Sequence, residues 1–280
     1  MLKRSSSRKK SERGIASLLA SIKEDRYSFL AFLLFVALTT TVLFYSLYLR
    51  HWHRVFMGAL TLALLLIPAL VERKFCVRLP SALEILAYTF IFCAGVLGEI
   101  AGFYERFSFW DDLLHAFNGY MFAAFGFCIV AIAERARPPR HTSPPWLATF
   151  VAFCFSMTVG AIWELFEYAT DNLFLCDMQK DTFLSSIHSI ALSGVGEEGA
   201  VHVQEITETV LITATGERIT YPGFLDIGLV DTMLDLFVNM QGALIFCTIG
   251  YLYLRYRRAR LARSFIPEVL ERKNENKEKG

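Results

Sequence analysis

Residues 29–49 form an unbroken apolar run, FLAFLLFVALTTTVLFYSLYL, in which tyrosine is the only ionisable residue type. At a helical rise of 1.5 Å per residue the run covers about 30 Å, which matches the hydrocarbon core of a bilayer. Further apolar blocks follow, and 54% of the 280 residues are hydrophobic. This pattern excludes a soluble enzyme, a disordered chain and a small disulfide-stapled secreted domain. It predicts a polytopic membrane protein.

The apolar blocks predict six transmembrane helices and therefore an all-α integral membrane protein. We place these spans at residues 29–49, 55–71, 82–104, 113–133, 147–169 and 229–254. The second span is short, and Pro68 near its end predicts a kink or an early exit from the membrane. Before the first span, residues 14–26 fit either an amphipathic surface helix or a flexible basic tail.

The distribution of Lys and Arg predicts the orientation of the chain. With the N-terminus in the cytoplasm, 23 of the 28 Lys and Arg lie in inner segments and 5 in outer segments. Because cytoplasmic loops carry the excess of basic residues, we expect a multi-pass membrane protein with both termini inside. Residues 1–28 and 255–280 are then basic cytoplasmic tails around the spans at 29–169 and 229–254.

A long insertion at residues 170–228 separates the fifth and sixth predicted spans. It is too long to be structureless, and it contains nine acidic residues against only Lys180 and Arg218. Residues 201–221 are rich in Thr, Val and Ile, with a turn at Thr215-Gly216, and therefore predict a β-hairpin in an extracytoplasmic cap. Residues 181–192 predict a short surface helix.

Ionisable side chains at membrane depth mark candidate sites because they are costly to place in lipid. In the predicted topology they fall within about 10 Å of the outer membrane face, and spacings of three or four residues put each set on one helix face. The ionisable candidates are Glu99 in span three, Asp111, Asp112 and His115 in span four, Glu164 and Glu167 in span five, and Asp231 and Asp235 in span six; the neutral amide of Asn239 follows on the same face of span six.

Several carboxylates cannot all stay ionised in a low dielectric, so the acids are protonated, bind a cation or line a wet vestibule. The lead hypothesis is a divalent metal held by Glu164, Glu167, Asp235 and His115, while Asp112 orients His115 for catalysis by a metal-bound water. Mg, Mn, Zn, Ca and Fe stay open, although an oxygen-rich set favours harder ions.

Some of these candidates also suit plainer roles. Asp111 and Asp231 are further candidate ligands, but acids at a helix N-terminus, Asp112 included, are favoured by the helix dipole. Asn239 suits an interhelical hydrogen bond better than a metal bond. No nucleophilic serine motif or glycine-rich phosphate loop points to another cofactor.

Four motifs in this order resemble the uncharacterised YjdF-type family of bacterial inner-membrane proteins. They are WDDLLH at 110–115, WELFE at 163–167, DMQKDT at 177–182 and LDIGLVDTMLD at 225–235. The resemblance covers residues 82–254, implies a bacterial membrane rather than a reaction, and draws attention to Asp177 and Asp181. More distantly, the acidic pattern, including Asp235-x-x-x-Asn239-x-x-Gly242, is similar to VanZ-like membrane proteins, some linked to glycopeptide resistance. That family usually has Gln where Glu167 stands.

Three functions stay open for such a protein in the lipid bilayer. The first is metal-dependent hydrolysis or group transfer on an envelope or lipid-linked substrate. The second is cation- or proton-coupled transport, against which the inner halves of the spans are almost free of charge. The third is a non-catalytic assembly protein whose cap recruits a partner. Nothing in the sequence points to nucleic acid.

Overall fold

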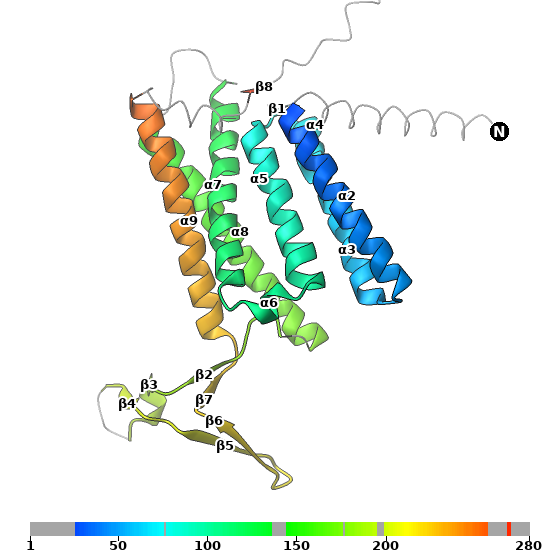
Figure 1. Ribbon diagram of the computed structural model, residues 1–280. Coiled ribbons are helices and arrows are strands. Elements are labelled where there is room, and N and C mark those ends of the chain that lie inside the picture. The colour runs from blue at the N-terminus through cyan, green and yellow to red at the C-terminus, as the bar shows by residue number, and fades with distance from the viewer. Residues whose placement is uncertain are drawn as a thin grey trace, which may run out of the picture. The chain divides into compact units, whose positions relative to one another are not determined.

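The computed structural model describes residues 26–75, 77–135, 144–175, 177–194, 199–256 and 268–269. Within them, six helices are long and apolar enough to cross a membrane, and a small β region lies between the fifth and the sixth (Figure 1). The predicted fold class is confirmed. The spans are Arg26–Tyr48, Trp52–Lys74, Ser81–Ile100, Trp110–Ala131, Pro145–Phe174 and Leu229–Tyr256. The expectations for residues 14–25 and for most of the C-terminal tail lie outside the described residues.

The second span is interrupted where the sequence predicts a kink. It consists of α3 (Trp52–Leu64) and α4 (Ile67–Phe75). At the break, the Leu65 amide donates to Thr61 at 3.0 Å and the Leu66 amide donates to Ala63 at 3.2 Å. Pro68 explains the break, because it has no N–H and its ring crowds the carbonyl four residues earlier.

The third span changes its helical form partway along. The α-helix α5 (Ser81–Phe92) continues as the π-helix η1 (Cys93–Ile100). A left-handed glycine, Gly102 at φ +70°, then precedes the short helix α6 (Phe103–Arg106). The wider π-helical turn places Gly95 against Thr61 of α3, where an added Cβ would lie 2.2 Å from the Thr61 hydroxyl oxygen.

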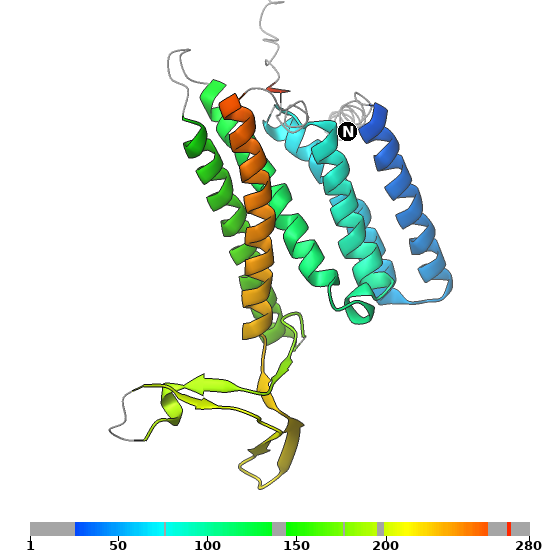
Figure 2. The ribbon, with the colours of Figure 1, turned by 60° about the vertical axis from the view of Figure 1, so that its left-hand side comes forward.

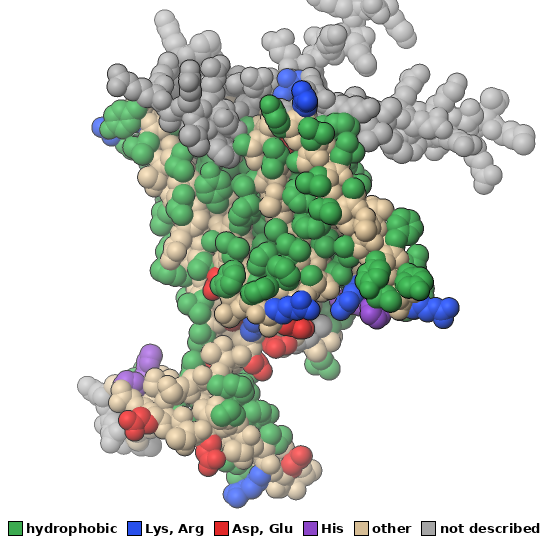
Figure 3. Space-filling model, in the orientation of Figure 1, with side chains coloured by type: hydrophobic (Ala, Val, Ile, Leu, Met, Phe, Trp, Pro, Cys, Tyr) green, Lys and Arg blue, Asp and Glu red, His purple; other side chains and the backbone are tan. Residues whose placement is uncertain are grey.

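The described chain divides into two compact units. The first holds the residues up to Val159 and those from Val238 onward, and it includes α2 (Arg26–Tyr48) and α7 (Trp110–Arg135). Its core packs buried side chains such as Leu83, Met121 and Phe246. In Figures 1 and 2, α2, α3 and α5 run side by side. Hydrophobic side chains also cover the outer face of these helices in Figure 3, as expected for helices that contact lipid.

Small residues bring the helices of the first unit together. A Cβ added at Gly119 of α7 would lie 1.9 Å from the carbonyl oxygen of Asn239, which belongs to α9 (Leu229–Tyr256). A Cβ added at Gly242 of α9 would lie 1.8 Å from the carbonyl oxygen of Ala116. The two glycines therefore let the backbones of α7 and α9 approach as closely as small residues allow in membrane helices.

The second unit, Gly160–Phe237, contains the end of α8 (Pro145–Phe174), the start of α9 and three antiparallel strand pairs. The pairs are β2 (Thr182–Leu184) with β7 (Phe224–Asp226), β3 (Ile187–Ser189) with β4 (Val201–Val203), and β5 (Glu208–Ile212) with β6 (Arg218–Pro222). In Figure 2 the β3–β4 and β5–β6 ribbons extend separately from the β2–β7 pair.

The predicted hairpin is confirmed as β5 and β6, with Gly216 at φ +81° in the turn between them. The predicted helix at residues 181–192 is wrong. That segment forms β2, β3 and only a single 3₁₀ turn, Ile190–Leu192. Strand structure is favoured over a helix because Thr182, Phe183 and Leu184 pair with β7, which lies about forty residues later in the chain.

Candidate functional site

Three carboxylates from two helices come together in the second unit. Glu164 and Glu167 lie on α8, and Asp235 lies on α9. Their exposed fractions are 4%, 6% and 2%. Each of the three offers a carboxylate oxygen, and these oxygens lie within 4.8 Å of one another. We refer to Glu164, Glu167 and Asp235 as the tricarboxylate cluster.

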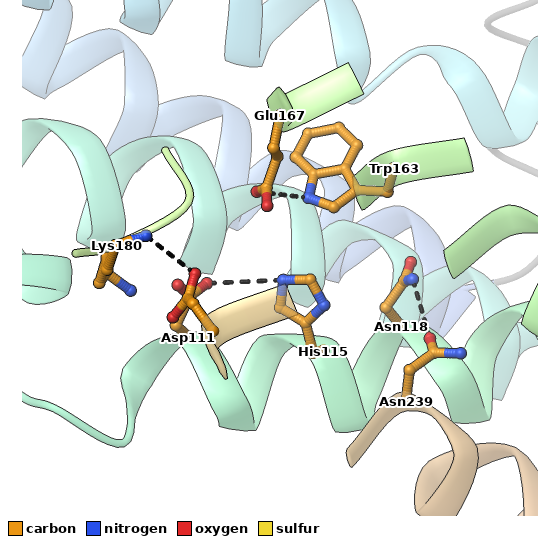
Figure 4. Close-up of polar contacts among 8 residues, drawn as sticks. Asp111, His115, Asn118, Trp163, Glu167, Lys180 and Asn239 are labelled. Carbon is orange, nitrogen blue, oxygen red and sulfur yellow. Dashed lines mark hydrogen bonds and ion pairs between the residues drawn. The ribbon is translucent and has the colours of Figure 1, made fainter. Parts of the chain in front are cut away.

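The local sequence explains how α8 contributes two of these acids. Glu164 and Glu167 are three residues apart and so lie on one face of the helix. Trp163, one residue before Glu164, donates a 2.8 Å hydrogen bond from Nε1 to Oε1 of Glu167 (Figure 4). The indole ring thus holds the Glu167 carboxylate in place.

Electrostatics decide what such a cluster requires. Two ionised carboxylates 4.8 Å apart repel by about 3 kcal/mol at an effective dielectric constant near 20. Burial adds a desolvation cost to each charge. Three buried acids at this spacing therefore need either protons or a cation to balance their charge.

A polar frame surrounds Asp231, one turn before Asp235 on α9. The backbone amide of Lys180 donates to Oδ2 of Asp231 at 3.0 Å. An oxygen of Asp231 also lies within 4.8 Å of an oxygen of Asp235. Gln179 donates a 2.5 Å hydrogen bond to the hydroxyl of Thr232. The segment after α8 is thereby fastened to the first turn of α9, and Asp231 has a structural contact as well as a place beside the cluster.

Asp171 is a residue that the sequence did not single out. Its two carboxylate oxygens accept the backbone amides of Met178 at 2.7 Å and Gln179 at 2.8 Å. Both contacts join a side chain to backbone amides of the segment after α8, whereas sequence periodicity indicates only which side chains share a face. No sequence pattern could therefore have indicated this role.

Asp177 and Asp181 form a different environment from the tricarboxylate cluster, since both side chains are exposed. The pKa of Asp181 is raised. The main cause is partial desolvation of its carboxylate, and the negative charges of Asp177, Asp171 and Asp226 add to it. Asp226 in turn accepts the amide of Val230 at 2.8 Å, in the first turn of α9. These acids therefore make a solvated acidic surface rather than a buried site.

His115 lies in the first unit, on α7, and is buried. Its Nε2 is 3.7 Å from Oδ1 of Asp111, an ion-pair distance between residues one turn apart (Figure 4). Asp112 is exposed, so Asp111 is the acid beside the imidazole here, and a catalytic role for Asp112 stays a prediction. Both spacings, three and four residues, fit a helix face, and in α7 the four-residue partner is the one beside the ring.

Two further candidates have positions of their own. Asn239 is fully buried in the first unit, accepts a 3.1 Å hydrogen bond from Nδ2 of Asn118, and contacts the sulfur of Met157 at 3.6 Å. It has the interhelical role that the sequence favours. Glu99 lies on η1 with an exposed side chain.

Comparison with known proteins gives a family but no activity. A family model described as "Predicted membrane protein (DUF2238)" matches residues 30–256. An uncharacterized protein of Thermotoga maritima is 24% identical over 106 residues, which are 38% of this chain and 53% of the relative. The chain thus spans about half the length of that relative. No solved structure matches.

Proposed function

The chain belongs to the family of predicted membrane proteins DUF2238, whose model covers most of its length, and from this premise we propose that it binds a divalent cation at the tricarboxylate cluster. The single observation that supports the proposal is the approach of three buried carboxylates, from α8 and α9, to within 4.8 Å. The expected membership of an uncharacterised membrane family is confirmed; the closer YjdF-type and VanZ-like resemblances stay predictions.

The spacing of the cluster suits a hard divalent ion. Oxygens bind Mg²⁺ at 2.0–2.1 Å and Ca²⁺ at 2.3–2.6 Å, so two oxygens across one ion are separated by no more than about 4–5 Å. One divalent charge also offsets several carboxylates at once, whereas protonation needs a proton for nearly every acid. Mg, Mn and Ca fit the oxygen ligands best, and Zn and Fe fit if an imidazole joins them.

The sequence supplies further proposed ligands. We propose His115 as the imidazole ligand, with Asp111 holding its ring in place of Asp112, and Asp231 as an additional acid beside Asp235. A histidine that binds a metal is commonly held by a carboxylate at its other ring nitrogen. Substitution of His115 therefore tests whether the site is purely carboxylate or mixed.

We propose hydrolysis or group transfer on an envelope or lipid-linked substrate as the reaction class. The excess of Lys and Arg in the segments assigned to the cytoplasm supports an inner-membrane protein with both termini inside and the acids toward the outer face. A bound divalent ion would supply charge stabilisation and an activated water. Neighbouring residues of the chain orient the acids: Trp163 positions the Glu167 carboxylate, and the Lys180 amide positions the Asp231 carboxylate.

Elemental analysis of the detergent-purified protein tests the metal proposal. We expect near-stoichiometric divalent metal in the wild type and its loss in Glu164→Gln and Asp235→Asn. The matched control is Glu208→Gln, which removes an exposed acid of β5 in the same unit and should keep the metal. Absence of metal from the wild type after incubation with Mg, Mn, Zn, Ca and Fe would exclude the proposal, as would equal metal in Asp235→Asn.

One observation favours cation- or proton-coupled transport as a second candidate. The first unit holds two buried acids outside the tricarboxylate cluster, Glu72 on α4 and Glu84 on α5. Glu72 accepts the amide of Leu79 at 2.7 Å. Transport predicts ion flux into proteoliposomes that is lost in both Glu84→Gln and Asp235→Asn, whereas a metal site alone predicts no flux.

An assembly role instead predicts that removal of the strand region, and not substitution of the acids, abolishes function.

A further inference from the structure

A pair of histidines faces across the β3–β4 ribbon of the second unit. His188 on β3 and His202 on β4 are directly opposite each other in the antiparallel ladder. Their ring centroids are 6.4 Å apart, with the ring planes at 83°. Both side chains are exposed, and in Figure 3 histidine side chains gather on this ribbon. Directly opposed residues of antiparallel strands project from the same face, so the two rings lie beside each other.

We propose that His188 and His202 form a bis-histidine site that chelates a late first-row divalent cation, with Zn²⁺, Ni²⁺ and Cu²⁺ as the class it takes. Imidazole nitrogen suits these ions. With metal–nitrogen distances of about 2.0–2.1 Å, two imidazoles on one tetrahedral ion have centroids about 5 Å apart. The rings therefore need to close by roughly 1 Å, which rotation of exposed side chains supplies without moving the strands.

The backbone on both sides of the pair fixes this geometry. Ile187 pairs with Val203 and Ser189 pairs with Val201, so the histidine pair has a ladder partner on each side. Beyond β3, the hydroxyl of Ser189 accepts the amide of Ala191 at 3.1 Å. On the other side, Ile206 donates its amide to Ser185 at 2.8 Å. The register of the two histidines is thus set before a metal arrives, which reduces the entropic cost of chelation.

The surrounding charge favours a cation. The insertion at residues 170–228 contains nine acidic residues and two basic ones, and a negative surface raises the local concentration of divalent ions. A bound ion would link two strands separated by eleven intervening residues and stabilise a ribbon of only three residues per strand. The metal would thus add to the stability of a ribbon whose register the backbone already sets.

This site and the tricarboxylate cluster are separable by chemistry. Oxygen ligands favour Mg²⁺, Mn²⁺ and Ca²⁺, whereas two imidazoles bind these ions poorly and Ni²⁺, Cu²⁺ and Zn²⁺ well. Asp235→Asn should therefore leave nickel binding at the ribbon intact. His188→Ala should leave binding of Mg²⁺ or Mn²⁺ at the cluster intact.

Calorimetric titration of the full-length protein in detergent with NiCl₂, with an affinity tag that lacks histidine, tests the inference. We expect one high-affinity equivalent that disappears in His188→Ala/His202→Ala and weakens about tenfold or more in each single variant, because the second ligand acts at high effective concentration. His51→Ala/His53→Ala is the matched control, since it also removes two exposed histidines, and it should keep that equivalent.

Electron paramagnetic resonance of the Cu²⁺ form provides an independent readout. The wild type should show two coordinating imidazole nitrogens, and His188→Asn, a polar replacement that preserves the exposed strand, should show one. Equal affinity and stoichiometry in the wild type and the double variant would overturn the proposal. Loss of the equivalent in His51→Ala/His53→Ala, or one nitrogen in the wild type, would overturn it as well.

Discussion

Asn118 of α7 donates a 3.1 Å side-chain hydrogen bond to Asn239 of α9, and both side chains are buried. Interhelical hydrogen bonds of this kind contribute about 0.6–2 kcal/mol in membrane proteins. We expect Asn118→Ala and Asn239→Ala each to lower the free energy of unfolding by about 1 kcal/mol, with the double variant costing less than the sum. A double-mutant cycle from denaturation in mixed micelles measures the coupling. Strict additivity would show that the two amides act independently.

The contact of Gly119 with α9, beside this asparagine pair, should tolerate substitution less well than the asparagines do. A Cβ at Gly119 would lie 1.9 Å from the backbone oxygen of Asn239, and a backbone atom cannot rotate away. We expect Gly119→Ala to cost about 1–3 kcal/mol or to prevent folding, measured by thermal unfolding and size-exclusion chromatography. The matched control is Gly250→Ala on α9, where the added Cβ meets only the Phe127 ring at 3.3 Å. Equal melting temperatures for the two variants would contradict this reading of the α7–α9 contact.

The tricarboxylate cluster predicts opposite effects of one substitution with and without metal. Without divalent ions, Glu164→Gln relieves repulsion among three buried acids, so its melting temperature should rise by about 2–4 °C. With saturating Mg²⁺ or Mn²⁺ the wild type should gain stability and the variant should not. Thermal unfolding in EDTA and in each ion separates the two effects. A full metal-induced shift in Glu164→Gln would remove Glu164 from the ligand set.

Asp171 should control the segment that joins α8 to the strands. Because its two oxygens accept the amides of Met178 and Gln179, Asp171→Ala should cost about 2–3 kcal/mol, since hydrogen bonds to charged groups contribute about 1.5–3 kcal/mol. Asp171→Asn keeps one acceptor oxygen and should cost less. Limited proteolysis in residues 175–182 measures the opening, with Glu208→Gln as the control. Equal cleavage of all three variants would show that Asp171 does not fasten this segment.

The spans could be predicted from the sequence because a helix that crosses lipid must be apolar along its whole length. The run at residues 29–49 has no charge, and no soluble structure tolerates it. The β5–β6 hairpin was predictable because Gly216 takes a positive φ in a local turn. Both predictions depend on neighbours in the chain.

Non-local pairings escaped prediction for a related reason. Strands of three residues, such as β2 and β3, are too short to show a period of two, and β2 pairs with residues about forty positions later. The choice of Asp111 over Asp112 beside His115 depends on side-chain rotamers, because spacings of three and of four residues both fit one helix face. Shared depth in the membrane indicated Glu164, Glu167 and Asp235 as one group, but the contacts of Asp171 and Asp231 with the backbone after α8 required the folded chain.

The raised pKa of Asp181 predicts a pH dependence of stability with a definite sign. An acid whose pKa is higher in the folded state binds more protons there than in the unfolded chain, so stability falls as the pH rises through the interval between the two pKa values. The penalty is absent below the unfolded value of about 3.9 and complete above the folded one. Asp181→Asn removes it, so the variant should melt slightly above the wild type at pH 7.5 and together with it near pH 3.5.

Asp181 is exposed, and solvent screening keeps this difference small, within the range of about 0.5 kcal/mol typical of surface substitutions. Salt should reduce it further, because the neighbouring charges of Asp177, Asp171 and Asp226 contribute to the shift. Melting curves at both pH values, in low and in 0.5 M salt, measure the effect. Asp177→Asn should reproduce part of the gain, because among these neighbouring charges that of Asp177 raises the pKa of Asp181 most. A variant that melts below the wild type at pH 7.5 would reverse the sign and refute the assignment.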